Sequence, residues 1–179
     1  DHLDEASREH RDVGSHGLSA VATVAPGDAS IAIAVTPLTT IAAMNLGVSF
    51  GDGNADVNTP PTGIEGLTPE AVTAANTTVA EAFGISGGHG ANDIPALVID
   101  AQGEVTQSDA YGRALAMVSA LEAGTEQSFA DTLMRLADDI DDQGELSPEL
   151  KGELVSASQH LGEVTRDEAA GQLQYAPTG

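Results

Sequence analysis

The clearest chemistry in this sequence lies in an acidic run that starts at Asp52. Side-chain oxygens recur at every second position, in Asp52, Asn54, Asp56 and Asn58. Ca²⁺ binds about six to eight oxygen atoms, and a loop that turns such a set toward one point supplies several of them. The start of the run fits the EF-hand loop, but the sixth residue is Val57 instead of glycine. We predict a calcium site here, with a solvated acidic loop of Asx turns as the alternative.

A second acidic stretch, residues 138–145, offers another cation site. Counted from Asp139, the third residue is Asp141 and the sixth is Gly144, as in a calcium loop. The twelfth position is Leu150 instead of the expected glutamate. Asp139 and Asp141 are therefore candidate ligands, and the alternative is a helix end, a glycine turn and a new helix.

Three further features are candidates for ligand contact. Residues 87–94 fit one unit of a calcium β-roll, although Asn92 replaces the usual Asp and one unit cannot form a roll. We take Asn92 and Asp93 as possible ligand contacts, because loops on a rigid scaffold usually carry binding. Asn76 lies beside an apolar stripe, so it either contacts a ligand or makes a structural hydrogen bond to a neighbouring loop or hairpin. Tyr111 is expected to pack its ring in the core with its hydroxyl at the edge.

The composition excludes several classes of function. The 179 residues include 28 Asp and Glu but only 6 Lys and Arg, a net charge of −22, which makes nucleic acids and anionic membranes poor partners. Cysteine is absent, which excludes disulfide scaffolds and thiolate zinc sites. Walker, H-E-x-x-H and Rossmann patterns are also absent, so we predict that the protein is not an enzyme.

Helices must position these residues, and the sequence contains clear signals for where the helices start. Thr36-Pro37, Thr68-Pro69 and Ser147-Pro148 each place an N-cap before a proline at the first helical position. Apolar residues recur at helical spacing after each start and also within 108–121 and 127–140. In the last helix the expected inner residues include Leu150, Leu154 and Leu161.

The predicted fold class is mainly α: a bundle of about five amphipathic helices with an N-terminal β-hairpin, and an α+β fold is the alternative. The hairpin is expected from Leu18–Ala25 and Ser30–Val35, which flank the turn sequence Pro26-Gly27-Asp28. We divide the chain into three parts. They are a polar lead-in over 1–17, one helical domain over 18–164, and a loose tail over 165–179.

Several short blocks occur in an order that resembles a known type of protein. They include VTPLT at 35–39, TAAN at 73–76, AYG at 110–112 and LADDI at 136–140. Over residues 18–150 the chain resembles helical modules of large repetitive bacterial surface proteins. These are the type I-secreted, RTX-type adhesins and the cadherin-like repeat proteins. The resemblance implies an extracellular, calcium-loaded module on the bacterial cell surface.

We therefore expect a calcium-dependent adhesin module that binds a peptide or glycan of a host or neighbouring cell. Its other partners would be flanking modules of the same chain, with no nucleic acid and no insertion into a membrane. Two alternatives remain open. One is a structural spacer without a ligand of its own, and the other is a soluble protein of a halophile, which the low Lys and high Asp and Glu content also fits.

Overall fold

The computed structural model is mainly helical. It describes residues 18–22, 33–48, 62–85, 90–92, 110–125 and 127–176, without the side chains of 141–143 and 163–164. In this part of the chain the helices are α1 (Pro37–Asn45), α2 (Pro69–Ala82), α3 (Ala110–Gly124), α4 (Phe129–Gln143), α5 (Pro148–Ser158), the short 3₁₀ helix η1 (Gln159–Leu161) and α6 (Glu163–Gln172). The predicted mainly-α bundle is confirmed. None of the described helices is long and apolar enough to cross a membrane.

The helices begin where the sequence predicts. The side chains of Thr36, Thr68 and Ser147 each accept a hydrogen bond from the backbone N–H three residues later. Each of these caps is followed by proline, whose missing N–H costs nothing in the first turn. Two helices end near glycines, because Gly47 and Gly84 take left-handed backbone angles (φ 71° and 70°) that other residues avoid.

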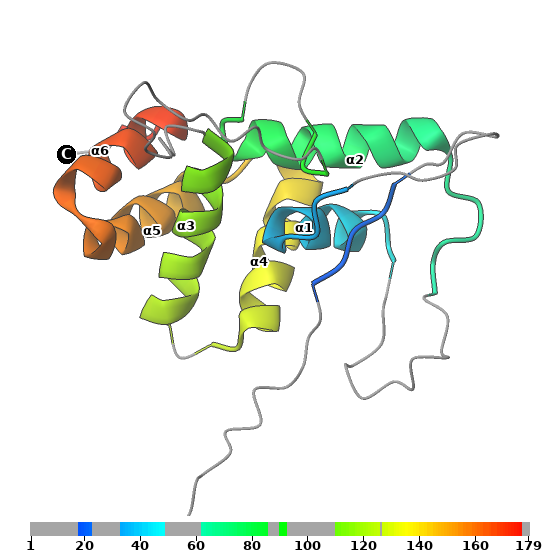
Figure 1. Cartoon of the computed structure of the whole chain (residues 1–179), viewed down its shortest axis with the longest axis horizontal. Coiled ribbons are helices and arrows are strands. Elements are labelled where there is room, and N and C mark those ends of the chain that lie inside the picture. The colour runs from blue at the N-terminus through cyan, green and yellow to red at the C-terminus, as the bar shows by residue number, and fades with distance from the viewer. Residues whose placement is uncertain are drawn as a thin grey trace, which may run out of the picture.

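The helices form two groups that share one core (Figure 1). In one group α1 packs against both α2 and α4, and in the other α5 packs against both α3 and α6. The helix α3 joins the groups, since it also contacts α1 and α4. Residues distant in sequence, from Leu38 to Leu173, therefore belong to a single hydrophobic cluster.

Aliphatic side chains dominate this cluster, and alanine is common among them. Phe83 and Tyr111 are its fully buried aromatic members, and Tyr175 packs at its edge. With so little aromatic volume, alanines on the facing sides let the helix backbones approach closely. Buried examples are Ala42, Ala80, Ala114, Ala137 and Ala169. Among the described residues, the core is thus made mainly of Ala, Val, Leu and Ile.

The predicted hairpin lies mostly outside the described residues. Its described parts, 18–22 and 33–35, are not regular strands. Both are nevertheless attached to the bundle. Ser19 exchanges hydrogen bonds with the side chains of Thr39 and Thr40 on α1. Ala34 N–H donates to the carbonyl oxygen of Asn92 at 3.1 Å.

The prediction of a loose tail from Thr165 is wrong over the described residues. The segment forms α6, and Ala169 and Leu173 are buried in the common core. The signal was weak because, among the side chains described there, Ala169 in the polar helix and Leu173 at its C-cap are the ones fully buried. The prediction of Leu161 as an inner residue is also wrong. α5 ends at Ser158, and the 3₁₀ turn leaves Leu161 48% exposed.

The two C-terminal leucines provide a matched test of this correction. Leu173→Ala removes a side chain that is 2% exposed and should lower the free energy of unfolding by about 2–5 kcal/mol. Leu161→Ala should change it by no more than about 0.5 kcal/mol, because that side chain is half exposed. Urea unfolding followed by circular dichroism measures both values. Equal, small effects of the two substitutions would contradict the docking of this segment and would support a loose tail.

Candidate functional site

The hydroxyl group of Tyr111 lies where three segments of the chain meet. Tyr111 is the second residue of α3 and is 3% exposed. Its hydroxyl donates to the carbonyl oxygen of Ala91 and lies 2.9 Å from the hydroxyl of Thr36, the N-cap of α1. The prediction that the ring packs in the core is confirmed, and the hydroxyl is buried with it.

Asn76 on α2 completes the attachment of Ala91. Its backbone carbonyl accepts from Ala91 N–H at 3.0 Å, so Ala91 is held through both its N–H and its C=O group. The Asn76 side chain is buried, and its Nδ2 donates to the carbonyls of Val72 (2.9 Å) and Val21 (3.4 Å). The bond to Val21 is the structural hydrogen bond to the expected hairpin segment. Asn76 Oδ1 has no partner within the described chain.

The segment 90–92 packs closely on α2. A Cβ atom added to Gly90 would lie 2.7 Å from Asn92 Oδ1 and 3.4 Å from the Cβ of Asn76. Glycine at position 90 therefore keeps the backbone near the helix. Asn92 is only partly buried, and its carbonyl oxygen accepts from Ala34 N–H.

The structure thus brings together three of the four predicted ligand-contact residues. Asn76 and Tyr111 meet through Ala91, and Asn92 is the next residue along the chain. Asp93 lies outside the described residues. Because Asn76 and Tyr111 are buried, a ligand at the surface would meet the segment they hold, not the two side chains. Sequence reasoning missed Ala91, which acts through its backbone and carries no side-chain signal.

The first predicted calcium loop, with Asp52, Asn54, Asp56 and Asn58, lies outside the described residues. The second is described in part.

The second acidic stretch belongs to a helix end. Residues 138–142 lie in the last turns of α4, which ends at Gln143, and Gly144 adopts the left-handed angles of a C-cap. Asp139 Oδ2 accepts from Ser147 N–H at 2.7 Å, joining α4 to the N-cap of α5. The alternative of a helix end, a turn and a new helix is confirmed. The side chain of Asp141 is not described, and the described residues contain no group of three or more potential metal-ligating side chains.

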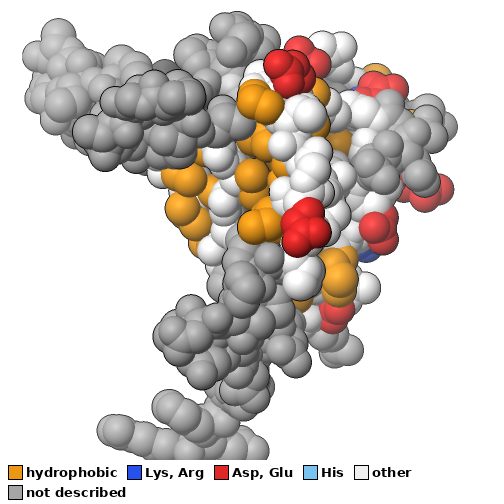
Figure 2. All heavy atoms as spheres, turned by 90° about the vertical axis from the view of Figure 1, so that its right-hand side faces the viewer, with side chains coloured by type: hydrophobic (Ala, Val, Ile, Leu, Met, Phe, Trp, Pro, Cys, Tyr) orange, Lys and Arg blue, Asp and Glu red, His pale blue; other side chains and the backbone are white. Residues whose placement is uncertain are grey.

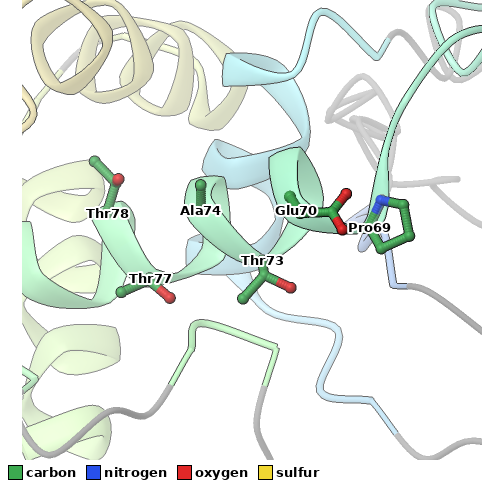
Figure 3. A pocket seen from close by; sticks show the side chains of 6 residues that line it. All are labelled: Pro69, Glu70, Thr73, Ala74, Thr77 and Thr78. Carbon is green, nitrogen blue, oxygen red and sulfur yellow. The ribbon is translucent and has the colours of Figure 1, made fainter.

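An open groove runs along the outer side of α2 (Figure 3). Its volume is about 550 Å³, and it is lined by Pro69, Glu70, Thr73, Ala74, Thr77 and Thr78. Three hydroxyl groups and one carboxylate are available there for hydrogen bonds. Asn76 lies between Thr73 and Thr77 in the sequence, and the segment 90–92 runs beside the same helix.

Acidic side chains are scattered over the face shown in Figure 2, and basic ones are scarcely visible there. The described basic groups are mostly engaged with carboxylates. Arg135 bonds to Glu153, and this hydrogen bond raises the pKa of the guanidinium. Arg113 lies 3.8 Å from a carboxylate oxygen of Glu168. Such exposed pairs contribute little stability. Because the chain has 28 Asp and Glu against 6 Lys and Arg, the surface remains strongly anionic.

No protein-family model matches this chain, and comparison with curated proteins and with solved structures gave no significant match.

The two tyrosines test the importance of the Tyr111 hydroxyl. Tyr111→Phe leaves the carbonyl of Ala91 without this donor and should lower the free energy of unfolding by about 1–3 kcal/mol. Tyr175→Phe is the matched control, since the described chain offers its hydroxyl no hydrogen bond, and its effect should stay within about 0.5 kcal/mol. Urea unfolding measures both. If the two variants behave alike, the Tyr111 hydroxyl does not fix the segment 90–92.

Proposed function

We propose that this chain is an extracellular, calcium-dependent binding module of a large bacterial surface adhesin. Its ligand would be a peptide or glycan on a host or neighbouring cell. The observation that carries the proposal is the attachment of the segment 90–92 to a rigid helical core through Ala91. Loops fixed on a rigid scaffold are the usual place for binding.

The calcium requirement is supported by charge and by spacing. A net charge of −22 makes the folded chain repel itself, and bound divalent cations reduce that repulsion. The alternating oxygens of Asp52, Asn54 and Asp56 have the chemistry of a hard-cation site. The extracellular location comes from the resemblance to adhesin modules, whose surroundings contain calcium at millimolar concentration.

The groove on α2 is the described surface that suits such a ligand. Threonine hydroxyls can both donate and accept, which fits the amides of an extended peptide or the hydroxyls of a sugar. The groove is open along its length, and its walls carry only short side chains apart from Glu70. A ligand lying in the groove would pass beside the segment 90–92, which packs against the same helix.

Thermal unfolding with EDTA and then with graded CaCl₂ tests the calcium requirement. A site of extracellular affinity, with a dissociation constant on the order of 10⁻⁴–10⁻³ M, should add about 1–3 kcal/mol at millimolar calcium. The double variant Asp52→Asn and Asp56→Asn should lose this gain. The variant Glu81→Gln and Asp167→Asn makes the same change in net charge at exposed helix positions and should keep it.

Sodium chloride at matched ionic strength separates the proposal from the halophile alternative. The proposal requires that calcium stabilises the fold more than the matched salt does. Equal stabilisation by both salts, or no response to calcium, would contradict it.

Peptide and glycan arrays probed with the calcium-loaded protein test the binding surface. Ala74→Arg places a long side chain in the groove and should reduce binding at least tenfold, because it fills the space and brings a charge. Ala123→Arg is the matched control, an exposed alanine on α3 away from the groove, and should bind as the unchanged protein does. Absence of any bound peptide or glycan would favour the spacer alternative.

A further inference from the structure

The side chain of Gln172, the last residue of α6, joins three helices. Its Nε2 atom donates to the carbonyl oxygens of Phe83, at the end of α2, and of Ala110, the first residue of α3, both at 2.8 Å. Its Oε1 atom accepts from Arg113 Nε at 2.8 Å. One amide therefore uses both donors and its acceptor to hold the end of α2 next to the start of α3.

The backbone of α6 also approaches the end of α2 closely. A Cβ atom added to Gly84 would lie 2.2 Å from the carbonyl oxygen of Gln172, so only glycine fits at position 84. Gly84 also has a positive φ of 70°, which other residues adopt rarely. Burial of Ala169 and Leu173 keeps α6 seated in this position.

The residue that Gln172 binds at the start of α3 is next to Tyr111, whose hydroxyl holds Ala91. Ala110, whose carbonyl Gln172 binds, precedes Tyr111 in the first turn of α3. Tyr111 holds Ala91, and Ala91 also bonds to Asn76 on α2. Since α2 and α3 are both fixed by Gln172 at their facing ends, a shift of α6 would change the spacing between Asn76 and Tyr111. The segment 90–92 would then no longer fit between Asn76 and Tyr111.

We propose that Gln172 is a positioning residue that couples the docking of α6 to the placement of the segment 90–92. The functional meaning of this coupling rests on the binding role proposed above for that segment. Through this coupling, the C-terminal helix α6 regulates the binding surface. When α6 is docked, the segment 90–92 is held in place, and when α6 is displaced, the segment is released. A neighbouring part of an adhesin that pulled on the chain at the C-terminal side would act on this contact of α6.

Hydrogen exchange of single amides, read by NMR on the ligand-free protein, tests the coupling. Gln172→Glu keeps the size of the side chain but removes both N–H donors, so the carbonyls of Phe83 and Ala110 lose their partner. We expect the amides of Ala91 and Ala34 to exchange at least tenfold faster, while those in the middle of α4 stay unchanged. Gln174→Glu adds the same charge two residues away, at an exposed position, and should leave all of these rates unaltered.

Coupling between two sites is reciprocal, which gives a second measurement. Tyr111→Phe should speed exchange of the Leu173 amide, which bonds to the Ala169 carbonyl in α6. If Gln172→Glu fails to fold, Gln172→Met removes the same hydrogen bonds without adding charge and is read in the same way.

Two results would overturn the proposal: faster exchange confined to α6, or an equal rise in all helices. Neither measurement uses calcium or a ligand, so failure of the proposed function would leave this test intact. If an array ligand is found, Gln172→Glu should weaken its binding while Gln174→Glu does not.

Discussion

The bonds of the Tyr111 hydroxyl set the arrangement of the elements around it. A buried carbonyl needs a hydrogen-bond donor, and the carbonyl of Ala91 finds one only if α3 starts at the right place. The same hydroxyl lies beside Thr36, so the first turn of α1 is fixed to the same point. Asn76 adds α2 through its backbone carbonyl. The buried hydroxyl thus joins α3 to α1 and to the segment 90–92, and that segment in turn joins α2.

Such polar contacts are important here because the apolar core has few aromatic side chains and many alanines. Alanine-rich faces bury surface and permit close helix packing, but they have little shape to select one arrangement over another. Hydrogen bonds are directional, and each one left unmade in the interior is costly. The bonds of Tyr111, Asn76 and Gln172 therefore select the relative placement of helices that hydrophobic burial alone would leave less defined.

The acidic residues divide between surface charge and local structure. Asp139 shows the second role, since its carboxylate accepts from the N–H of Ser147 and fixes the turn between α4 and α5. Its spacing from Asp141 and Gly144 resembled a calcium loop because both kinds of structure place an acid a few residues before a glycine turn. The pattern alone could not separate them. The position of Ser147 relative to Asp139 depends on how α5 packs back against α4.

The sequence by itself determined the helices α1 to α5, because capping and apolar spacing act within a few residues. Thr36, Thr68 and Ser147 start helices as predicted, and apolar residues at helical spacing, such as Val72 and Val79, are buried. Only the tertiary structure decided which polar groups meet: the partners of Gln172 are 59, 62 and 89 residues away along the chain. It likewise decided that α6 docks while Leu161 faces solvent, since a weakly apolar helix is ordered by the surface that receives it.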